Sequence, residues 1–467
     1  MRTGGTFYLS ALIVAQAAAL VRYVTLARLL GPEQLGIAVI IVLTAQLLDS
    51  ITDAGADRFL IQDNDGGTPT ALGLIHSVAV MRGISIAILL QVFASPVATF
   101  FRIEGLAPAL RIFAIVPLIG GFTNFHFRLA QRQHDFAPEA ILRILSELAG
   151  LAGTAIAAYV IRDYTAILYG LSARALTAAF TSQYLANGSY RFAYSPELAR
   201  RLAKFSAPLV ISGLVMFIGS QSDRVVIGNT LGPKVLGQYS GVFLLIMYPS
   251  AMAQRFLSGT LLPKISQAED RDHSTRELES ISILVSTCML CGFVLVAPLA
   301  IPILYGPAFK VGIGVIGLIG ILQSIRFLRF WPALEGLAFG ATATVMASNV
   351  VRVASLPLAI LAVNLGGDLR WILVSYIAGE LIALFVGIAG VNRATKRART
   401  FGFASSLWFA GLALAVACAV EGFSQHLLLF AGMSAALSFA FAVWIMVRAR
   451  YALPSLIELV VPKRAHT

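Results

Sequence analysis

Charged side chains are scarce in this chain: Asp, Glu, Lys and Arg make up 12% of its 467 residues, about half the share that is usual in soluble domains. Hydrophobic residues make up 58%, and the mean hydropathy is +0.82. Apolar runs of roughly twenty residues recur along the sequence, the length that crosses a bilayer core as a helix. The composition excludes a soluble globular protein and predicts an all-α polytopic membrane protein.

Cysteine is rare as well, with three residues in the chain. Cys288 and Cys291 have the Cys-x-x-Cys spacing of redox and zinc sites, but no second pair or nearby histidine completes such a site. Both lie in an apolar run, as does Cys418. We interpret Cys288 and Cys291 as small packing residues and expect neither a metal nor a cofactor.

Long polar segments are also missing, since no loop between apolar runs exceeds about twenty residues. The sequences GxxxxGK[ST], HExxH and GxSxG do not occur. The chain therefore carries no ATPase or soluble catalytic module, and we do not expect an enzyme. The N-terminal apolar stretch lacks a small-residue cleavage site, so it predicts a retained first helix.

Fourteen apolar segments are long enough to span a membrane. Twelve of them predict two lobes of six helices, and two more follow at the C-terminus: 7–29, 37–59, 73–99, 107–128, 139–161, 164–186, 206–229, 236–262, 280–305, 311–331, 339–363, 369–391, 404–421 and 425–447. We predict an N-lobe at 1–200, a C-lobe at 201–395, and two helices with a cytoplasmic tail at 396–467.

One motif, LGPxxLG, occurs twice, at 30–36 and again 201 residues later at 231–237. Each copy lies between two long apolar segments, where Gly-Pro favours a tight turn. The equivalent positions indicate an internal repeat. Because each half has an even number of spans, both halves enter the membrane in the same direction, an arrangement in which a central site lies between two rocking lobes.

Basic residues are distributed unevenly over the loops. With this count of spans, 21 Lys and Arg fall on the side of the N-terminus and seven on the opposite side, with seven inside spans. This bias places both termini in the cytoplasm. It also explains the net charge of +12, so we expect no nucleic-acid partner.

Arginine inside a membrane span costs about 2.5–3.5 kcal/mol on insertion, and seven such residues are unusual. Arg174 and Arg352 lie near mid-membrane and are the strongest candidates to face a water-filled cavity. For Arg82 and Arg255, which lie in the cytoplasmic halves of their spans, snorkelling is the alternative. For Arg143 the alternative is pairing with Glu139 or Glu147. The candidate cavity cations are Arg22, Arg82, Arg143, Arg174, Arg224, Arg255 and Arg352.

Acidic residues inside spans suggest gating or coupling sites. Asp49, Asp53 and Asp57 are spaced to lie on one helical face, and Glu147 and Glu380 also lie within spans. Asp223 stands at the position equivalent to Arg22 in the repeat, so an ion-pair gate between these two residues is a hypothesis.

Other polar residues have simpler interpretations. Asp63-x-Asp65 resembles the metal motif of membrane glycosyltransferases, but its Gly- and Asn-rich surroundings favour a solvated turn. His76 and His126 are isolated, so a core or interface role is favoured over metal ligation.

Arginines suit a phosphate-bearing cargo, because guanidinium binds phosphate with two parallel hydrogen bonds and stays charged. With a negative cytoplasm, outward movement of such an anion is favourable by about 2.3 kcal/mol per charge per 100 mV. Flipping of a lipid-linked diphosphate could therefore run on voltage, and the acids need not couple an ion.

Several stretches together resemble the polysaccharide (O-antigen) flippase branch of the multidrug/oligosaccharidyl-lipid/polysaccharide (MOP) exporter superfamily. They are RLLGPEQLG at 28–36, Arg128-x-x-x-Arg132-x-x-x-Phe136, KFSAPL at 204–209, and DRVVIG at 223–228 followed by LGPxxLGxY ending at Tyr239. The resemblance covers essentially the whole chain.

This resemblance implies two six-helix lobes in a V that opens alternately to each side, with two extra C-terminal helices. It implies export of an undecaprenyl-pyrophosphate-linked oligosaccharide across a bacterial inner membrane, with basic cavity residues binding the anionic cargo. A polysaccharide polymerase and a chain-length regulator would be the expected partners.

Three other functions stay open. A cation-coupled drug exporter would share the fold, but we would expect an acidic or apolar cavity. A flippase for the peptidoglycan precursor lipid would share the basic cavity and the extra helices. A membrane glycan polymerase, ligase or glycosyltransferase needs a sizeable outer loop or a placed acid motif, which this sequence does not provide.

Overall fold

A computed structural model describes residues 2–53, 55–186, 188–267, 271–395 and 405, which are helical apart from the connecting segments. The chain divides into two compact units, Met1–Gly241 and Val242–Thr467. The first unit ends at Gly241 rather than at residue 200, because α9 packs against α1 and α3. Compactness and repeat symmetry are different criteria, so the predicted lobes at 1–200 and 201–395 stay a prediction.

The first predicted turn motif forms a kink inside one long helix, α1 (Arg2–Thr52). Gly31 has φ 81° and ψ 176° there, a conformation that favours glycine because it has no Cβ. Pro32 then begins the second arm, where its missing N–H costs nothing. The predicted spans 7–29 and 37–59 therefore correspond to two arms of α1, except that the second arm ends at Thr52.

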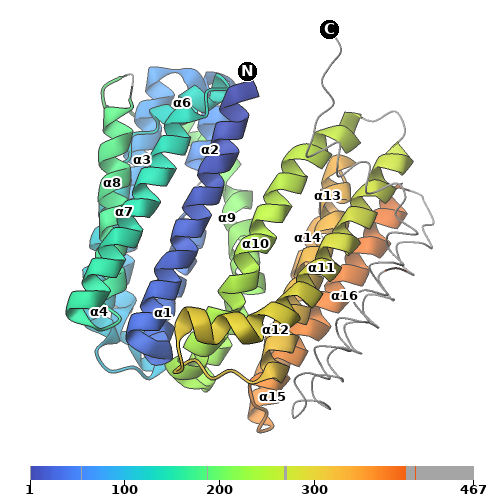
Figure 1. Ribbon diagram of the computed structural model, residues 1–467. Helices are drawn as coiled ribbons and strands as arrows, with labels where there is room; N and C mark the ends of the chain where they lie inside the picture. Colours follow the sequence, from blue (N-terminus) through green and yellow to red (C-terminus); the bar gives the residue numbers. More distant parts are fainter. Residues whose placement is uncertain (1, 54, 187, 268–270, 396–404, 406–467) are drawn as a thin grey trace. The chain divides into compact units, whose positions relative to one another are not determined.

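The first unit continues with α2 (Ala56–Gln62), η1 (Asn64–Gly67), α3 (Pro69–Phe101), α7 (Ala137–Ile161) and α8 (Ala166–Tyr184). Figure 1 shows α7 beside α8 and α1 beside α7. A Cβ on Gly170 would lie 1.7 Å from the Thr154 hydroxyl oxygen and 2.8 Å from the carbonyl oxygen of Gly150. Small residues thus bring the backbones of α7 and α8 close together.

The predicted span 107–128 is broken into three pieces, α4 (Leu106–Phe113), α5 (Ile115–Gly121) and α6 (His126–Arg132). The chain bends by 51° between Gly121 and His126. Non-helical backbone at this depth is tolerated where protein covers it. Here the Asn124 N–H donates to Ser182 and the Phe125 N–H donates to His76.

The second turn motif separates α9 (Pro196–Thr230) from α10 (Gly232–Gln267). Gly232 has φ 83°, as Gly31 has at the equivalent position of the first copy. The second unit contains most of α10 and then α11 (Arg271–Tyr305), α12 (Ile313–Leu328), α13 (Phe330–Ala338), α14 (Thr342–Arg352), α15 (Ser355–Asn364) and α16 (Leu369–Thr395).

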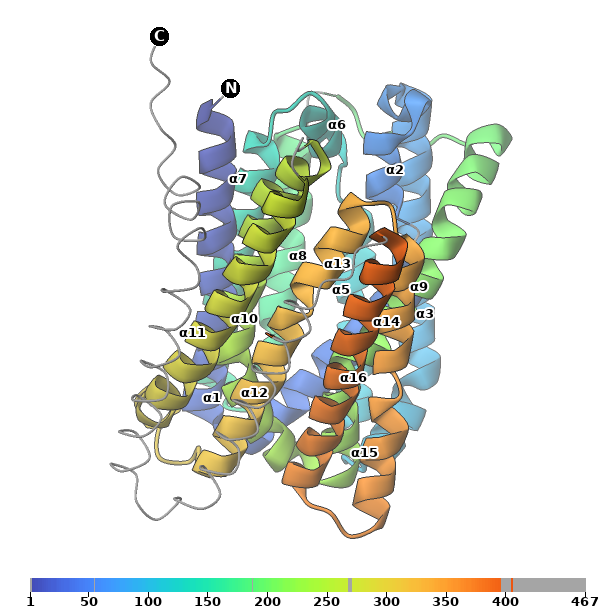
Figure 2. The same ribbon diagram turned by 90° about the vertical axis from the view of Figure 1, so that its right-hand side faces the viewer.

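The predicted spans of the second half coincide with these helices, but two of them are interrupted. The span 311–331 is α12, followed by α13 after a break at Arg329, and 339–363 is α14 and α15 with a break at Val353 and Ala354. Figure 2 shows α14 and α16 side by side.

Nine of the described helices are long and apolar enough to cross a membrane, or ten if the bent pair from Leu106 to Arg132 is one span. The kinked α1 counts once in this number. The predicted spans 404–421 and 425–447 lie outside the described residues. The structure therefore establishes an all-helical polytopic membrane protein, while the total of fourteen spans stays a prediction.

Candidate functional site

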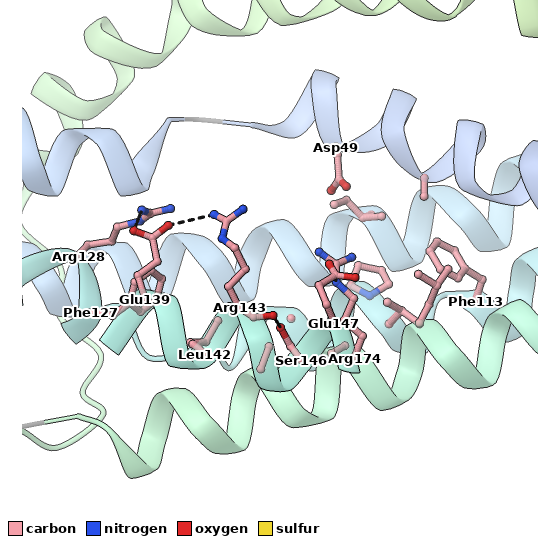
Figure 3. A pocket seen from close by; sticks show the side chains of 18 residues that line it. Asp49, Phe113, Phe127, Arg128, Glu139, Leu142, Arg143, Ser146, Glu147 and Arg174 are labelled. Carbon is pink, nitrogen blue, oxygen red and sulfur yellow. Dashed lines mark hydrogen bonds and ion pairs between the residues drawn. The ribbon is translucent and has the colours of Figure 1, made fainter. Parts of the chain in front are cut away.

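A polar cavity of about 370 Å³ lies within the first unit, among side chains from α1, α3 and α4 to α8. Figure 3 shows its charged lining. Glu139, Arg143 and Glu147 are four residues apart on α7, so they share one helical face. The ionisable residues of the lining are Asp49, Arg128, Glu139, Arg143, Glu147 and Arg174.

Glu147 joins two of the predicted cavity arginines. Its Oε2 lies 3.2 Å from Arg22 Nη1, and its Oε1 lies 2.7 Å from Arg174 Nε. The Arg22 side chain is 6% exposed, whereas that of Arg174 is 48% exposed. Arg174 is therefore the arginine of this triad that is open to the cavity.

Glu139 forms a second centre with two arginines. Its Oε1 lies 3.0 Å from Arg143 Nη2, and its Oε2 lies 3.1 Å from Arg128 Nη1. The Tyr8 hydroxyl also donates to Oε1, at 3.3 Å. The structural pairing considered for Arg143 is thus present, and Arg128, which the sequence placed in a loop, joins it in the cavity wall.

Asp49 faces the cavity from α1 and lies 3.0 Å from Arg82 Nη2 on α3. The predicted face of three carboxylates is wrong, because the helix ends at Thr52. The Asp53 carboxylate instead accepts the N–H of Gly55, whose φ of 57° turns the chain. Asp57 lies on α2 and pairs with Arg128 at 3.0 Å.

The predicted gate between Arg22 and Asp223 is not formed in this conformation. Within the described part of the chain, the ion-pair partner of Arg22 is Glu147. Asp223 is fully buried on α9 and accepts a hydrogen bond of 2.7 Å from the Tyr239 hydroxyl. Arg224 is buried beside it and does not line the cavity.

The second unit holds a separate cluster around Glu380 on α16. Its side chain is 1% exposed and lies within 2.8 Å of Arg326, 2.7 Å of Arg329 and 2.6 Å of Arg352. Arg326 and Arg352 occupy the last turns of α12 and α14, where the helix dipole favours a cation. Within this cluster three positive charges share one carboxylate.

The sequence alone assigned Arg326 and Arg329 to a cytoplasmic helix end, so these two members were missed. Their spacing of three residues, which places them on one helical face, was the available signal. Arg255 on α10 is exposed and belongs to neither cluster.

The Asp63-x-Asp65 turn is held by arginines. Arg201 on α9 reaches both carboxylates, with 2.6 Å to Asp65 Oδ2, and Arg132 donates to the carbonyl oxygens of Leu60, Asp63 and Asn64. The turn is therefore held rather than simply solvated. Among the residues that the structure describes, no group of three or more His, Cys, Asp or Glu could hold a metal ion.

Charge balance determines what the cavity can accept. Its lining carries three arginines and three carboxylates, so their formal charges cancel. Outside the lining, Arg22 pairs with Glu147, Arg82 with Asp49, and Asp57 with Arg128. Arg174, half exposed, can still offer N–H groups to an anion. A polar cavity of this kind among long apolar helices defines a membrane transport protein, since ionisable groups at membrane depth mark substrate or ion pathways.

Comparison with known proteins gives the family. A family model described as "Polysaccharide biosynthesis protein" matches residues 25–313, more than half of the chain, and the protein belongs to this family. The succinoglycan biosynthesis transport protein ExoT of Rhizobium meliloti is 28% identical over 329 residues, which cover 68% of this chain and 65% of ExoT. The matched region spans just under two thirds of the length of ExoT. These matches confirm the resemblance to polysaccharide biosynthesis proteins drawn from the motifs.

Two solved structures have the same fold. The lipid II flippase MurJ, in an inward closed conformation, has a TM-score of 0.69 at 12% identity and covers 94% of this chain and 99% of its own. An inward-facing multidrug resistance MATE transporter of the MOP superfamily has a TM-score of 0.65 at 16% identity, over 84% and 98%. At these identities the likeness establishes the fold alone.

Proposed function

We propose that this protein flips an anionic, undecaprenyl-pyrophosphate-linked oligosaccharide from the cytoplasmic to the periplasmic leaflet of a bacterial inner membrane. The observation that carries the proposal is Arg174, which is half exposed in the cavity of the first unit, in a member of a polysaccharide biosynthesis family. Arg174 binds the diphosphate, because it is the most exposed arginine of the Glu147 triad.

Transport proceeds by alternating access, with fourteen spans and both termini in the cytoplasm. The oligosaccharide follows the diphosphate through the polar cavity while the polyprenyl chain stays in the lipid. Voltage favours this direction by about 2.3 kcal/mol per negative charge per 100 mV. After release, a polymerase and a chain-length regulator assemble the repeat units.

A second candidate cargo is the peptidoglycan precursor lipid, which has the same diphosphate. The fold match to MurJ over 94% of the chain favours it. The match to ExoT, a succinoglycan biosynthesis transport protein, favours a surface glycan instead. The MATE fold match would equally allow a drug exporter, but the match to a polysaccharide biosynthesis family favours a glycan cargo.

The test is deletion of the gene, followed by analysis of lipid-linked oligosaccharides and surface glycan. We expect lipid-linked repeat units to accumulate and surface glycan to be lost. Arg174→Ala should reproduce this phenotype at normal protein levels, whereas Arg58→Ala, which removes an exposed arginine outside the cavity, should complement. Intact surface glycan with raised drug sensitivity would indicate the exporter, and surface glycan limited to single repeat units would indicate a polymerase.

A further inference from the structure

Glu147 occupies the position on Arg174 that a cargo phosphate would need. The carboxylate offers one oxygen to Arg174 Nε at 2.7 Å and the other to Arg22 Nη1 at 3.2 Å. A phosphate presents its non-bridging oxygens to guanidinium groups in the same way. The Nη groups of Arg174 can meet a phosphate while Nε still donates to Glu147, but this brings two anions to one guanidinium group. Because the two anions repel each other, cargo and Glu147 compete for the charge of Arg174.

Arg22 and Arg174 differ in how much room their side chains have to move. Arg22 is enclosed, because a Cβ on Gly150 would already lie 2.9 Å from its Nη1, and its side chain is 6% exposed. Arg174 is 48% exposed and lines the cavity. Glu147 can therefore release Arg174 and keep its contact with Arg22.

Competition between Glu147 and the cargo phosphate keeps Arg174 neutralised throughout a transport cycle. An empty carrier must return through an occluded state, where an unpaired arginine is costly because it has lost its water. With Glu147 on Arg174, the empty cavity returns with that charge neutralised. When cargo is bound, its phosphate neutralises the charge of Arg174 in the loaded carrier.

We propose that Glu147 is the internal counter-ion of the empty transporter: a cargo phosphate replaces it on Arg174, and it returns to Arg174 when the cargo leaves. The proposal rests on the proposed function and assigns Glu147 as a positioning residue that acts through Arg174. It makes the protein a net transporter of its anion instead of an obligate exchanger.

The first experiment measures binding of inorganic pyrophosphate to the purified full-length protein by calorimetry. Glu147→Gln removes the competing charge but keeps the shape, so the dissociation constant should fall by roughly three- to tenfold. In an Arg174→Gln background the same change should have no effect. Glu277→Gln is the matched control, because Glu277 pairs with Lys264 at 2.8 Å in the second unit.

The second experiment measures flipping of a polyprenyl-diphosphate monosaccharide in proteoliposomes. Glu147→Gln should lower net flux several-fold, and the same lipid supplied on the opposite side should restore the rate, because the variant then exchanges one anion for another. The wild-type protein should reach its full rate without lipid on the opposite side. Glu147→Asp keeps the charge on a shorter side chain. Its pyrophosphate affinity and its net flux should lie between those of the wild type and those of Glu147→Gln.

The outcomes separate the two proposals. If the wild type neither binds pyrophosphate nor flips the lipid, the proposed function is wrong. If the wild type does both and Glu147→Gln binds pyrophosphate no more tightly, or shows no stimulation by lipid on the opposite side, the counter-ion role is wrong. A variant that does not purify as a single species is replaced by Glu147→Asp, for which unchanged affinity and flux also contradict the role.

Discussion

Gly36 and Gly237, equivalent residues of the two LGPxxLG copies, pack reciprocally against each other's motif. A Cβ on Gly36 would lie 1.8 Å from the carbonyl oxygen of Pro233, and a Cβ on Gly237 would lie 1.7 Å from that of Pro32. The two copies of the repeat are thus in direct backbone contact within the first unit. Such contact distances require glycine, as they do where membrane helices cross closely.

Gly237→Ala should therefore destabilise the protein. The added methyl group must push the helices apart at Pro32, and overpacking of this kind costs about 1–3 kcal/mol. Thermal unfolding of the purified protein should show a lower midpoint. Gly259→Ala is the control, since among the described residues no atom beyond its own stretch of helix lies within 4 Å of its Cβ position. Equal effects of the two changes would contradict the close contact.

Glu380→Gln should be more harmful than loss of any one of its arginines. It leaves three guanidinium groups without their shared carboxylate, and breaking a buried ion pair from one side costs about 3–5 kcal/mol. Arg352→Gln leaves Glu380 with two cations and should be milder. Yield and thermal midpoint measure the difference, and the opposite order would show that the arginines do not depend on Glu380.

Charge reversal should test the contact between Arg201 and the Asp63-x-Asp65 turn. Arg201→Glu places three acids together, so hydrogen exchange of residues 60–67 should become faster. Adding Asp63→Arg and Asp65→Arg should restore part of the protection. No change in exchange after Arg201→Glu would mean that Arg132 alone holds the turn through its carbonyl contacts.

His76 should control the segment between α8 and α9. Its Nδ1 lies 3.1 Å from the Arg191 carbonyl oxygen, its Nε2 accepts the Phe125 N–H at 3.2 Å, and its ring stacks on Tyr190 at 4.1 Å. Burial raises the pKa of Tyr190 to about 12, so the phenol stays neutral and donates to Gly121.

His76→Phe keeps a ring but loses both hydrogen bonds, so residues 188–195 should become more sensitive to limited proteolysis. Tyr190→Phe keeps the stack and loses one bond, and its effect should be smaller. Cleavage at the wild-type rate in His76→Phe would show that packing of Gly73 on Ala193 is sufficient to hold the segment.

Local patterns in the sequence predicted much of this fold. Apolar length determines a membrane helix almost by itself, because every backbone group in lipid must be satisfied within the segment. The repeated Gly-Pro motif predicted both kinks, at Gly31 and Gly232. The break after Thr52 was not predicted, because Asp53 and Gly55 act through a side-chain contact and a positive φ that apolar length does not reveal.

The candidate site was predicted less completely. Glu139, Arg143 and Glu147 could be grouped because they are one turn apart on one helix. The partnership of Arg22 with Glu147 joins residues 125 positions apart, and no local pattern indicates it. Arg326 and Arg329 were missed because hydropathy does not show where a helix breaks inside the membrane.

The contact between Gly36 and Gly237 also provides a point about which α9 can rotate. Arg201 lies 29 residues before the end of α9 at Thr230, about 44 Å at 1.5 Å per residue. If α9 and the start of α10 turn together about the glycine contact, a rotation of roughly 10° moves Arg201 by about 8 Å, more than an ion pair can stretch. The glycine contact lies just beyond the C-terminal end of α9, and Arg201 lies near its N-terminal end. A small rotation about this contact would thus release the Asp63-x-Asp65 turn.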